Sequence, residues 1–154
     1  MDLKDRIKQR YFRNPGQEAI LNIMAASSVL RDMQNKILQA HGLSAQQYNI
    51  LRILNGGPKE GFPRCEIYER MVEKAPDITR LIDRLEKAQF VVRVRSDNDR
   101  RQSIARITEK GIKKLEELTP YITVHEQSIE KVFTKEDIKA IRMISSKIFA
   151  FDKK

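Results

Sequence analysis

Four arginines surround one predicted turn in the sequence RVRSDNDRRQ. Arg93 and Arg95 precede the turn-forming residues SDND, and Arg100 and Arg101 follow them. Guanidinium groups placed this close together repel one another unless solvent or an anion separates their charges. The segment is therefore either a solvated hairpin tip or a group of cations that contacts a negatively charged partner.

The positive charge of the whole chain lies in two segments. The 154 residues include 30 Lys and Arg against 21 Asp and Glu, which gives a net charge of +9. Residues 1–13 account for +3 of this and residues 74–114 for +6, while the remaining residues cancel. Basic charge gathered in this way is typical of nucleic-acid binders, and a solvated surface without a partner is the alternative.

The composition argues against several other classes of protein. No apolar run approaches the ~18 residues of a membrane span. A single cysteine, Cys65, and the absence of a secretory signal favour a reducing, cytoplasmic location. His41 and His125 have no companions at metal-ligand spacing, and there is no phosphate loop or nucleophile motif. We expect no metal, no cofactor and no enzyme activity.

Two predicted helices precede the arginine-rich turn. The sequence RCEIYERMVEK predicts a short helix, and Pro76 begins a second helix over 76–87, because proline is tolerated at a first helical position. The second helix has a buried stripe formed by Ile78, Leu81, Ile82 and Leu85. Its outer face is polar and basic and consists of Pro76, Asp77, Thr79, Arg80, Asp83, Arg84 and Lys87. This arrangement is typical of a helix-turn-helix.

The periodicity changes to two after this helix. The sequences FVVRVR and RQSIARI alternate around the turn and predict a β-hairpin over 91–107. Alternation places Val92 and Val94 on one face and Arg93 and Arg95 on the other. The arginine-rich turn is thus the tip of a two-stranded wing. The sequence NGGPKEGFP, before the short helix, is predicted to be a loop.

Amphipathic helices flank this lobe on both sides. Ser44 with Gln47 forms a capping box at the start of the lobe, and Thr108 and TKED begin the last two helices. Stripes of large aliphatic residues run through 18–41 and 112–150, more than a lobe of residues 42–110 can cover. We expect residues 1–154 to form one mainly α-helical winged helix-turn-helix protomer that dimerises through its N- and C-terminal helices. A larger monomeric core is the alternative.

The chain resembles the MarR family of winged helix-turn-helix transcriptional regulators over about residues 18–148. The resemblance rests on the order of LSAQQYNILRIL, EIYERM, DITRLIDRLEKAQFVVRVRSDNDRRQ and ARITEKG. It implies a homodimer that binds pseudo-palindromic double-stranded promoter DNA. Members are usually repressors that small phenolic ligands or oxidants release from DNA. Whether this chain represses or activates is left open.

The resemblance also implies which residues contact DNA. The helix 76–87 would lie in the major groove, and Asp99 would steady the wing while Arg101 enters the minor groove. Asp99 and Arg101 share one side of an extended chain, where a carboxylate can orient a guanidinium. The family's recognition face corresponds to Asp77, Thr79, Arg80, Asp83 and Arg84, of which Arg80 or Arg84 suits a guanine contact. Phosphate contacts are expected of Lys87, Arg93, Arg95 and Arg100.

Other positions bear on the end of the helix and on regulation. Gln89 stands where the family commonly has glycine, because the recognition helix ends there in a left-handed residue. The family's effector pocket lies between the terminal helices and the DNA-binding lobe, which makes Met24, Tyr48 and His125 candidates for it. Cys65 does not match the N-terminal cysteine of oxidant-sensing members, and an inert role is expected.

A function of another class is also compatible with the sequence. The same winged-helix dimer could dock an acidic protein partner through its basic face. Such a module would not bind DNA measurably, so Arg84→Ala and Arg101→Ala would leave its DNA affinity unchanged. A regulator would lose DNA affinity on each substitution.

Overall fold

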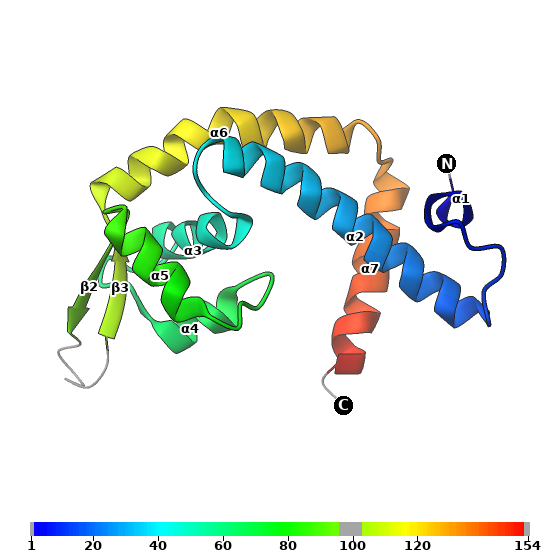
Figure 1. Ribbon diagram of the computed structural model, residues 1–154, viewed down its shortest axis with the longest axis horizontal. Coiled ribbons are helices and arrows are strands. Elements are labelled where there is room, and N and C mark those ends of the chain that lie inside the picture. The colour runs from blue at the N-terminus through cyan, green and yellow to red at the C-terminus, as the bar shows by residue number, and fades with distance from the viewer. Residues whose placement is uncertain (1, 96–102, 153–154) are drawn as a thin grey trace. The chain divides into compact units, whose positions relative to one another are not determined.

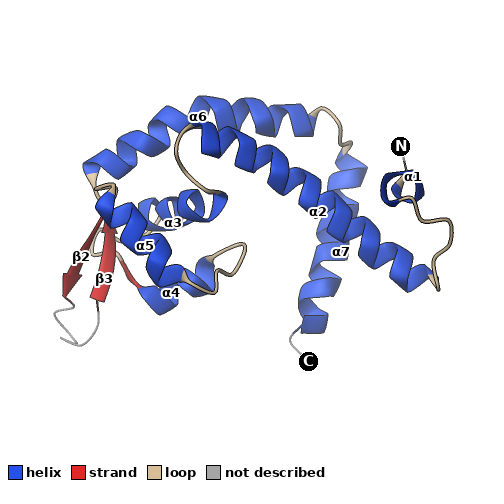
Figure 2. Ribbon diagram, in the orientation of Figure 1, coloured by secondary structure: helices blue, strands red, loops and turns tan. Residues whose placement is uncertain are grey.

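The structure is a computed structural model that describes residues 2–95 and 103–152. Helices make up most of it, and a small antiparallel sheet interrupts them (Figures 1 and 2). The predicted fold class is thereby confirmed. The chain divides into two compact units, Met1–Leu118 and Thr119–Lys154, which are described separately.

Side-chain caps fix where the helices of the first unit begin. Asn14 accepts a hydrogen bond from the backbone N–H of Gln17 at 2.9 Å, so the long helix begins at Pro15, ahead of the predicted start at 18. Ser44 and Gln47 form the predicted capping box. The helices of this unit up to the sheet are α1 (Leu3–Ile7), α2 (Pro15–Ala40), α3 (Ala45–Asn55), α4 (Arg64–Arg70) and α5 (Ile78–Lys87).

The core of the first unit holds the helix-turn-helix together. Tyr48, Leu51 and Leu54 form the inward stripe of α3 and are buried. Full burial of one large aliphatic side chain stabilises the fold by roughly 1.5–3 kcal/mol. The largest fully buried side chains come from five helices and one strand: Leu38, Ile50, Leu51, Ile67, Leu85, Leu118 and Val91.

The sheet has three strands where the sequence predicted two. β2 (Val91–Arg95) and β3 (Ser103–Ile107) form the predicted hairpin, and β1 (Phe62–Pro63) adds to the far edge of β3 in the order β1-β3-β2. The prediction of a loop throughout NGGPKEGFP was therefore wrong. Gly61 explains the pairing, because a Cβ at this residue (φ 86°) would lie 2.1 Å from the carbonyl oxygen of Ala105.

Side-chain alternation along β2 sets the direction of its arginines. Val92 and Val94 share one face, and Val91 shares the other with Arg93, as the period of two requires. Val91 is only 2% exposed, whereas Val92 is 41% exposed. The buried face of the strand is therefore the one that carries Arg93.

The short helix α4 ends earlier than predicted. It covers Arg64–Arg70, and Met71 already has an extended backbone with ψ 134°. The segment that follows runs to α5, and the N–H of Val72 donates to the side-chain oxygen of Asn49 at 3.0 Å. This contact across 23 residues of sequence replaces the next helical turn.

The C-terminal helices begin at the predicted caps. Thr108 caps α6 (Glu109–Glu130), since its Oγ1 accepts from the N–H of Gly111 at 3.1 Å. Thr134 and Asp137 exchange backbone and side-chain hydrogen bonds at the start of α7 (Lys135–Asp152). Of the described side chains of α7, Ser145 is half-buried and the others are exposed. Among the described residues, no helix combines the length and hydropathy that crossing a bilayer requires.

A polar contact within the first unit joins the end of α2 to α6. Nδ1 of His41, directly after α2, lies 3.2 Å from Oε1 of Glu117, and Nζ of Lys114 lies 3.0 Å from the same oxygen. The hydrogen bonds from Lys114 and His41 lower the pKa of Glu117 below its ordinary value.

The end of α5 uses a left-handed residue that is not glycine. Gln89 has a φ of 62°. Its N–H donates to the carbonyl of Glu86 at 2.8 Å, and the N–H of Phe90 donates to the carbonyl of Leu85 at 2.9 Å. These are the two bonds of a Schellman motif, whose left-handed position is usually glycine. The sequence-based expectation of a left-handed residue here is confirmed.

Gln89→Gly should raise the free energy of unfolding by about 1 kcal/mol, because a residue with a Cβ pays roughly that penalty in the left-handed region. Urea unfolding of the purified protein measures the change. Ala88→Gly is the matched control, since Ala88 has a φ of −76° and glycine there should lower the free energy of unfolding. Equal effects of the two substitutions would contradict the strain assigned to Gln89.

Candidate nucleic-acid interface

The first turn of α5 is organised by Asp77. Its Oδ1 accepts from the N–H of Arg80 at 3.2 Å, which makes Asp77 the N-cap, and the helix begins at Ile78. Pro76 therefore lies in the turn before the helix, not at its first position. Oδ2 of Asp77 also pairs with Nε of Arg80 at 3.0 Å. The Arg80 side chain is 79% exposed, so this pair is weak and the guanidinium can exchange it for another anion.

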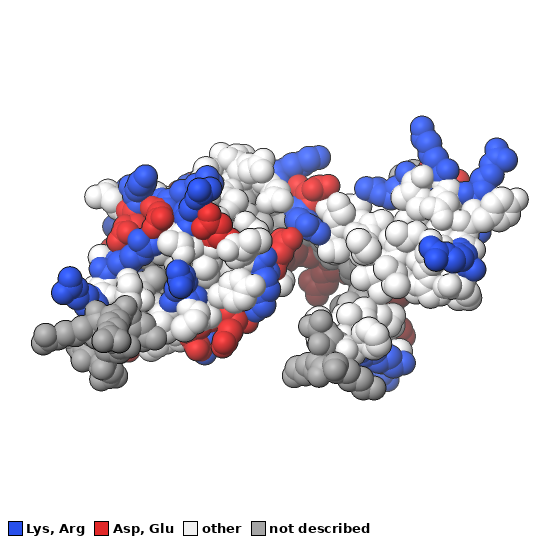
Figure 3. Space-filling model, turned by 60° about the horizontal axis from the view of Figure 1, so that its bottom comes forward, with Lys and Arg blue, Asp and Glu red and all other residues white. Residues whose placement is uncertain are grey.

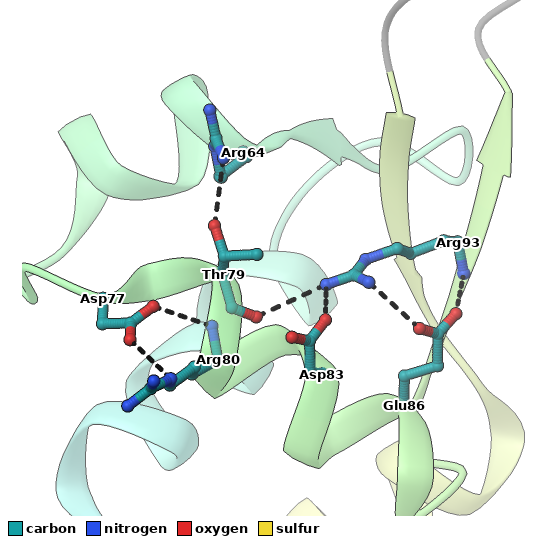
Figure 4. A network of polar contacts seen from close by, with 7 residues as sticks. All are labelled: Arg64, Asp77, Thr79, Arg80, Asp83, Glu86 and Arg93. Carbon is teal, nitrogen blue, oxygen red and sulfur yellow. Dashed lines mark hydrogen bonds and ion pairs between the residues drawn. The ribbon is translucent and has the colours of Figure 1, made fainter.

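Thr79 is held from a different helix. Nη1 of Arg64, the first residue of α4, donates to Oγ1 of Thr79 at 3.0 Å (Figure 4). This contact was not predictable from the sequence, because fifteen residues separate the two. Arg64 is exposed and belongs to the same surface as the predicted recognition residues, where sequence reasoning missed it.

Arg93 and Asp83 face each other across the junction of wing and helix. The Arg93 guanidinium forms ion pairs with Asp83 and Glu86, and its backbone N–H donates to Oε1 of Glu86 at 3.1 Å (Figure 4). Both side chains had been expected to point outward, Asp83 on the recognition face and Arg93 toward phosphate. The structure instead half-buries them against each other.

Three predicted cations remain available on this side of the molecule. Arg84 and Lys87 of α5 and Arg95 of β2 are exposed, and none takes part in an ion pair within the described part of the chain. Figure 3 shows that Lys and Arg side chains spread over the lobe that carries α5, with Asp and Glu between them. We call five exposed cations of this region the α5 surface: Arg64, Arg80, Arg84, Lys87 and Arg95.

The predictions for Asp99, Arg100 and Arg101 concern positions outside the described residues. Their flanks are described: Arg95 and Ser103 are register partners at the last pair of the hairpin. The roles of these three residues stay predictions.

The candidate effector residues occupy different surroundings. Tyr48 lines a hollow of about 180 Å³ within the first unit, whereas Met24 is exposed on α2 and is not in its lining. His125 belongs to the second unit. An ion pair of 3.0 Å between Arg31 and Glu73 borders the hollow. The other residues that line it are Gln34, Ala45, Gln46, Asn49 and Val72.

Cys65 and the histidines show no metal-binding arrangement. Cys65 is exposed beside a hollow of about 390 Å³ between α4, α5 and the sheet, which Arg64, Thr79 and Arg93 also line. Over residues 2–95 and 103–152, no three His, Cys, Asp or Glu side chains lie close enough together to hold a metal ion.

The segment from α2 through the wing to α6 matches a known protein family. Residues 32–118 match the family model described as Transcriptional regulator SarA/Rot. The chain belongs to the MarR/SarA family of winged helix-turn-helix transcriptional regulators. The predicted MarR resemblance is confirmed. MarR/SarA proteins are DNA-binding transcription regulators, a class distinct from enzymes.

Individual MarR/SarA relatives match most of the chain. The HTH-type transcriptional regulator MhqR of Bacillus subtilis is 29% identical over 110 residues, 71% of this chain and 74% of the relative. The transcriptional repressor MprA of Escherichia coli is 32% identical over 108 residues, 69% of this chain but only 61% of the relative. A MarR transcription factor from Planctomyces limnophilus is 34% identical, with a TM-score of 0.66 over 88% of this chain and 98% of that structure.

Arg64→Ala should weaken DNA binding by about 1 kcal/mol and reduce the slope of log K against log salt by about 0.9, if Arg64 contacts one phosphate. Fluorescence anisotropy with a labelled duplex at several salt concentrations measures both quantities. Arg52→Ala is the control, because Arg52 is exposed on α3 and lies outside the α5 surface. A variant whose affinity and salt slope match those of the wild type would remove Arg64 from the interface.

Proposed function

We propose that this protein is a homodimeric regulator that binds a pseudo-palindromic promoter site and represses transcription in the cytoplasm. Each protomer inserts α5 into a major groove and the wing into the adjacent minor groove. The observation that carries the proposal is the α5 surface. Arg84, Lys87 and Arg95 are exposed there and have no ion pair among the described residues, and a row of such cations on a helix-turn-helix complements DNA phosphates.

The residues of the α5 surface take different parts in recognition. Arg84 is exposed in the last turn of α5 and reads a base edge, where a bidentate arginine contact to guanine adds roughly 1–3 kcal/mol of discrimination. Arg80 leaves its weak pair with Asp77 to join it. Lys87 and Arg95 contact phosphates, which sets the register on the duplex. Asp99 orients Arg101 in the minor groove, and Arg100 contacts phosphate.

A protein of the same fold has been solved bound to DNA. Sco3205, a MarR family transcriptional regulator from Streptomyces coelicolor, has been solved in complex with DNA and superposes on this chain with a TM-score of 0.77. At 20% identity the likeness concerns the fold alone, so the contacts of individual residues belong to the proposal.

Unburied apolar side chains support a dimer. On α2, the exposed residues Ile20, Ile23 and Met24 continue the predicted stripe. On α7, Phe149 is 67% exposed and Phe151 80% exposed, and Ile138, Ile141, Ile144 and Ile148 are also exposed. Apolar area of this extent marks an interaction surface, and its burial contributes about 25 cal/mol per Å². A second copy of the chain covers these helices, 18–41 and 112–150, in our proposal.

An effector would bind the hollow beside Tyr48. A volume of about 180 Å³ suits a compact aromatic molecule such as a substituted phenol. CouR from Rhodococcus jostii, which has this fold at 19% identity and a TM-score of 0.73, has been solved bound to p-coumaroyl-CoA. An effector releases DNA only if its affinity is higher for the conformation that does not bind DNA than for the conformation that does.

Selection from a random duplex pool at about 150 mM salt should enrich one inverted repeat, because a two-fold dimer reads two identical half-sites about 10 bp apart. Sequencing of the bound fraction measures the enrichment. Weak binding that disappears with added salt, and that enriches no sequence, would contradict the proposal. That outcome would favour the alternative in which the basic face docks an acidic protein.

Ile144→Asp should convert the dimer to a monomer and reduce the affinity for the inverted repeat by roughly 100-fold or more, because a monomer loses the effective concentration of the second half-site. Sedimentation velocity measures the mass, and anisotropy measures the affinity. Ser146→Asp adds the same charge to an exposed polar position of α7 and should leave the dimer intact. Dissociation by both variants, or by neither, would contradict the assigned interface.

A further inference from the structure

Arg93 belongs to the wing, but its side chain is committed to the recognition helix. Its Nη2 donates to Oδ1 of Asp83, and its Nη1 lies 3.3 Å from Oε2 of Glu86 (Figure 4). Nη2 also lies 3.4 Å from the carbonyl oxygen of Thr79. The backbone N–H of Arg93 donates to Oε1 of Glu86 at 3.1 Å, so both the strand and the guanidinium are held.

The Arg93 side chain is more buried than the cations of the α5 surface. The Arg93 side chain is 31% exposed, whereas that of Arg80 on the neighbouring turn of α5 is 79% exposed. Arg93 stands opposite the buried Ala105 in the middle of the hairpin and on the same face as the buried Val91. These contacts engage Nη1 and Nη2, so a phosphate would have to compete with two carboxylates and a carbonyl group for the guanidinium.

The two carboxylates that contact Arg93 also need its positive charge. Asp83 and Glu86 are i,i+3 neighbours on α5 and lie on its side toward the wing, so without a cation between them they would repel each other and DNA. An arginine suits the position because its planar fork serves two acceptors at once, which the ammonium of lysine cannot do in the same geometry.

We infer that Arg93 is a positioning residue that ties the wing to the recognition helix through Asp83 and Glu86, and that it makes no phosphate contact in the DNA complex. The inference rests on the proposed function. The tie fixes the spacing between the two elements that enter neighbouring grooves. Its loss therefore reduces the preference for the specific site more than the general attraction to DNA.

Asp83→Asn distinguishes a positioning role of Arg93 from a phosphate contact, because the two roles predict opposite changes in DNA affinity. If Arg93 positions the wing, the substitution loosens the tie and weakens binding to the selected duplex by about 10-fold, which is one lost hydrogen-bonded charge partner. If Arg93 instead contacts phosphate, removal of a negative charge next to it strengthens binding, as expected from charge alone. Tighter binding by Asp83→Asn would overturn the inference.

Substitutions of Arg93 itself give a second readout. With Arg93→Gln, the slope of log K against log salt should stay at the wild-type value, whereas loss of a phosphate contact reduces it by about 0.9. Arg93→Lys should bind the selected duplex as weakly as Arg93→Gln, although a lysine would preserve a phosphate contact. The Arg93→Gln effect should also shrink in an Asp83→Asn background, because the two side chains act through one contact. A reduced slope, rescue by lysine or additive effects would each overturn the inference.

A measurement without DNA separates this inference from the proposed function. Hydrogen exchange of the free protein should be faster at Val91–Arg95 and Ser103–Ile107 in both Asp83→Asn and Arg93→Gln, because the wing opens locally when the tie is lost. Arg52→Gln, on α3, is the control and should exchange as the wild type does. Unchanged protection of the wing in both variants would overturn the inference, whatever DNA the protein binds. Failure of the wild type to select any sequence would overturn only the proposed function.

Discussion

The left-handed turn at Gln89 determines the geometry of the whole interface. It closes α5 with a Schellman motif and reverses the chain into β2, which then runs back along the helix. Thr108, at the start of α6, donates its backbone N–H to the carbonyl of Phe90 and its hydroxyl to that of Gln89. Gly111 permits this approach, since a Cβ there would lie 2.3 Å from the Phe90 carbonyl oxygen. Helix, wing and α6 therefore meet at one turn.

As a result, some charged side chains of residues 74–114 form contacts within the protein, and others remain exposed at the surface. Because β2 returns along α5, Arg93 meets Asp83 and Glu86 and forms ion pairs with both. Arg64 comes from α4 and joins the same surface through Thr79. A net charge of +6 over residues 74–114 therefore does not correspond to six contacts with a partner. The geometry leaves Arg84, Lys87 and Arg95 exposed.

The terminal helices connect assembly to recognition in the proposed function. α7 leaves its aliphatic and aromatic side chains exposed, and α2 does so along part of its length. A long helix with an uncovered apolar stripe gains its stability from a partner surface and not from helix propensity alone. If a second copy covers these stripes, two α5 surfaces are held at a fixed separation. The spacing of the DNA half-sites would then follow from the length of the dimerisation helices.

The sequence by itself determined those features that local interactions control. The Ser44–Gln47 box, the Thr108 cap, the Thr134–Asp137 pair, the left-handed Gln89 and the β2–β3 hairpin were predictable, because each depends on residues close together along the chain. Only the tertiary structure decided the pairing of β1 with β3, the partners of Arg93 and the place of Arg64. These join residues of different elements, whose meeting is set by the packing of the core and by one turn of the backbone, and side-chain type alone does not reveal it.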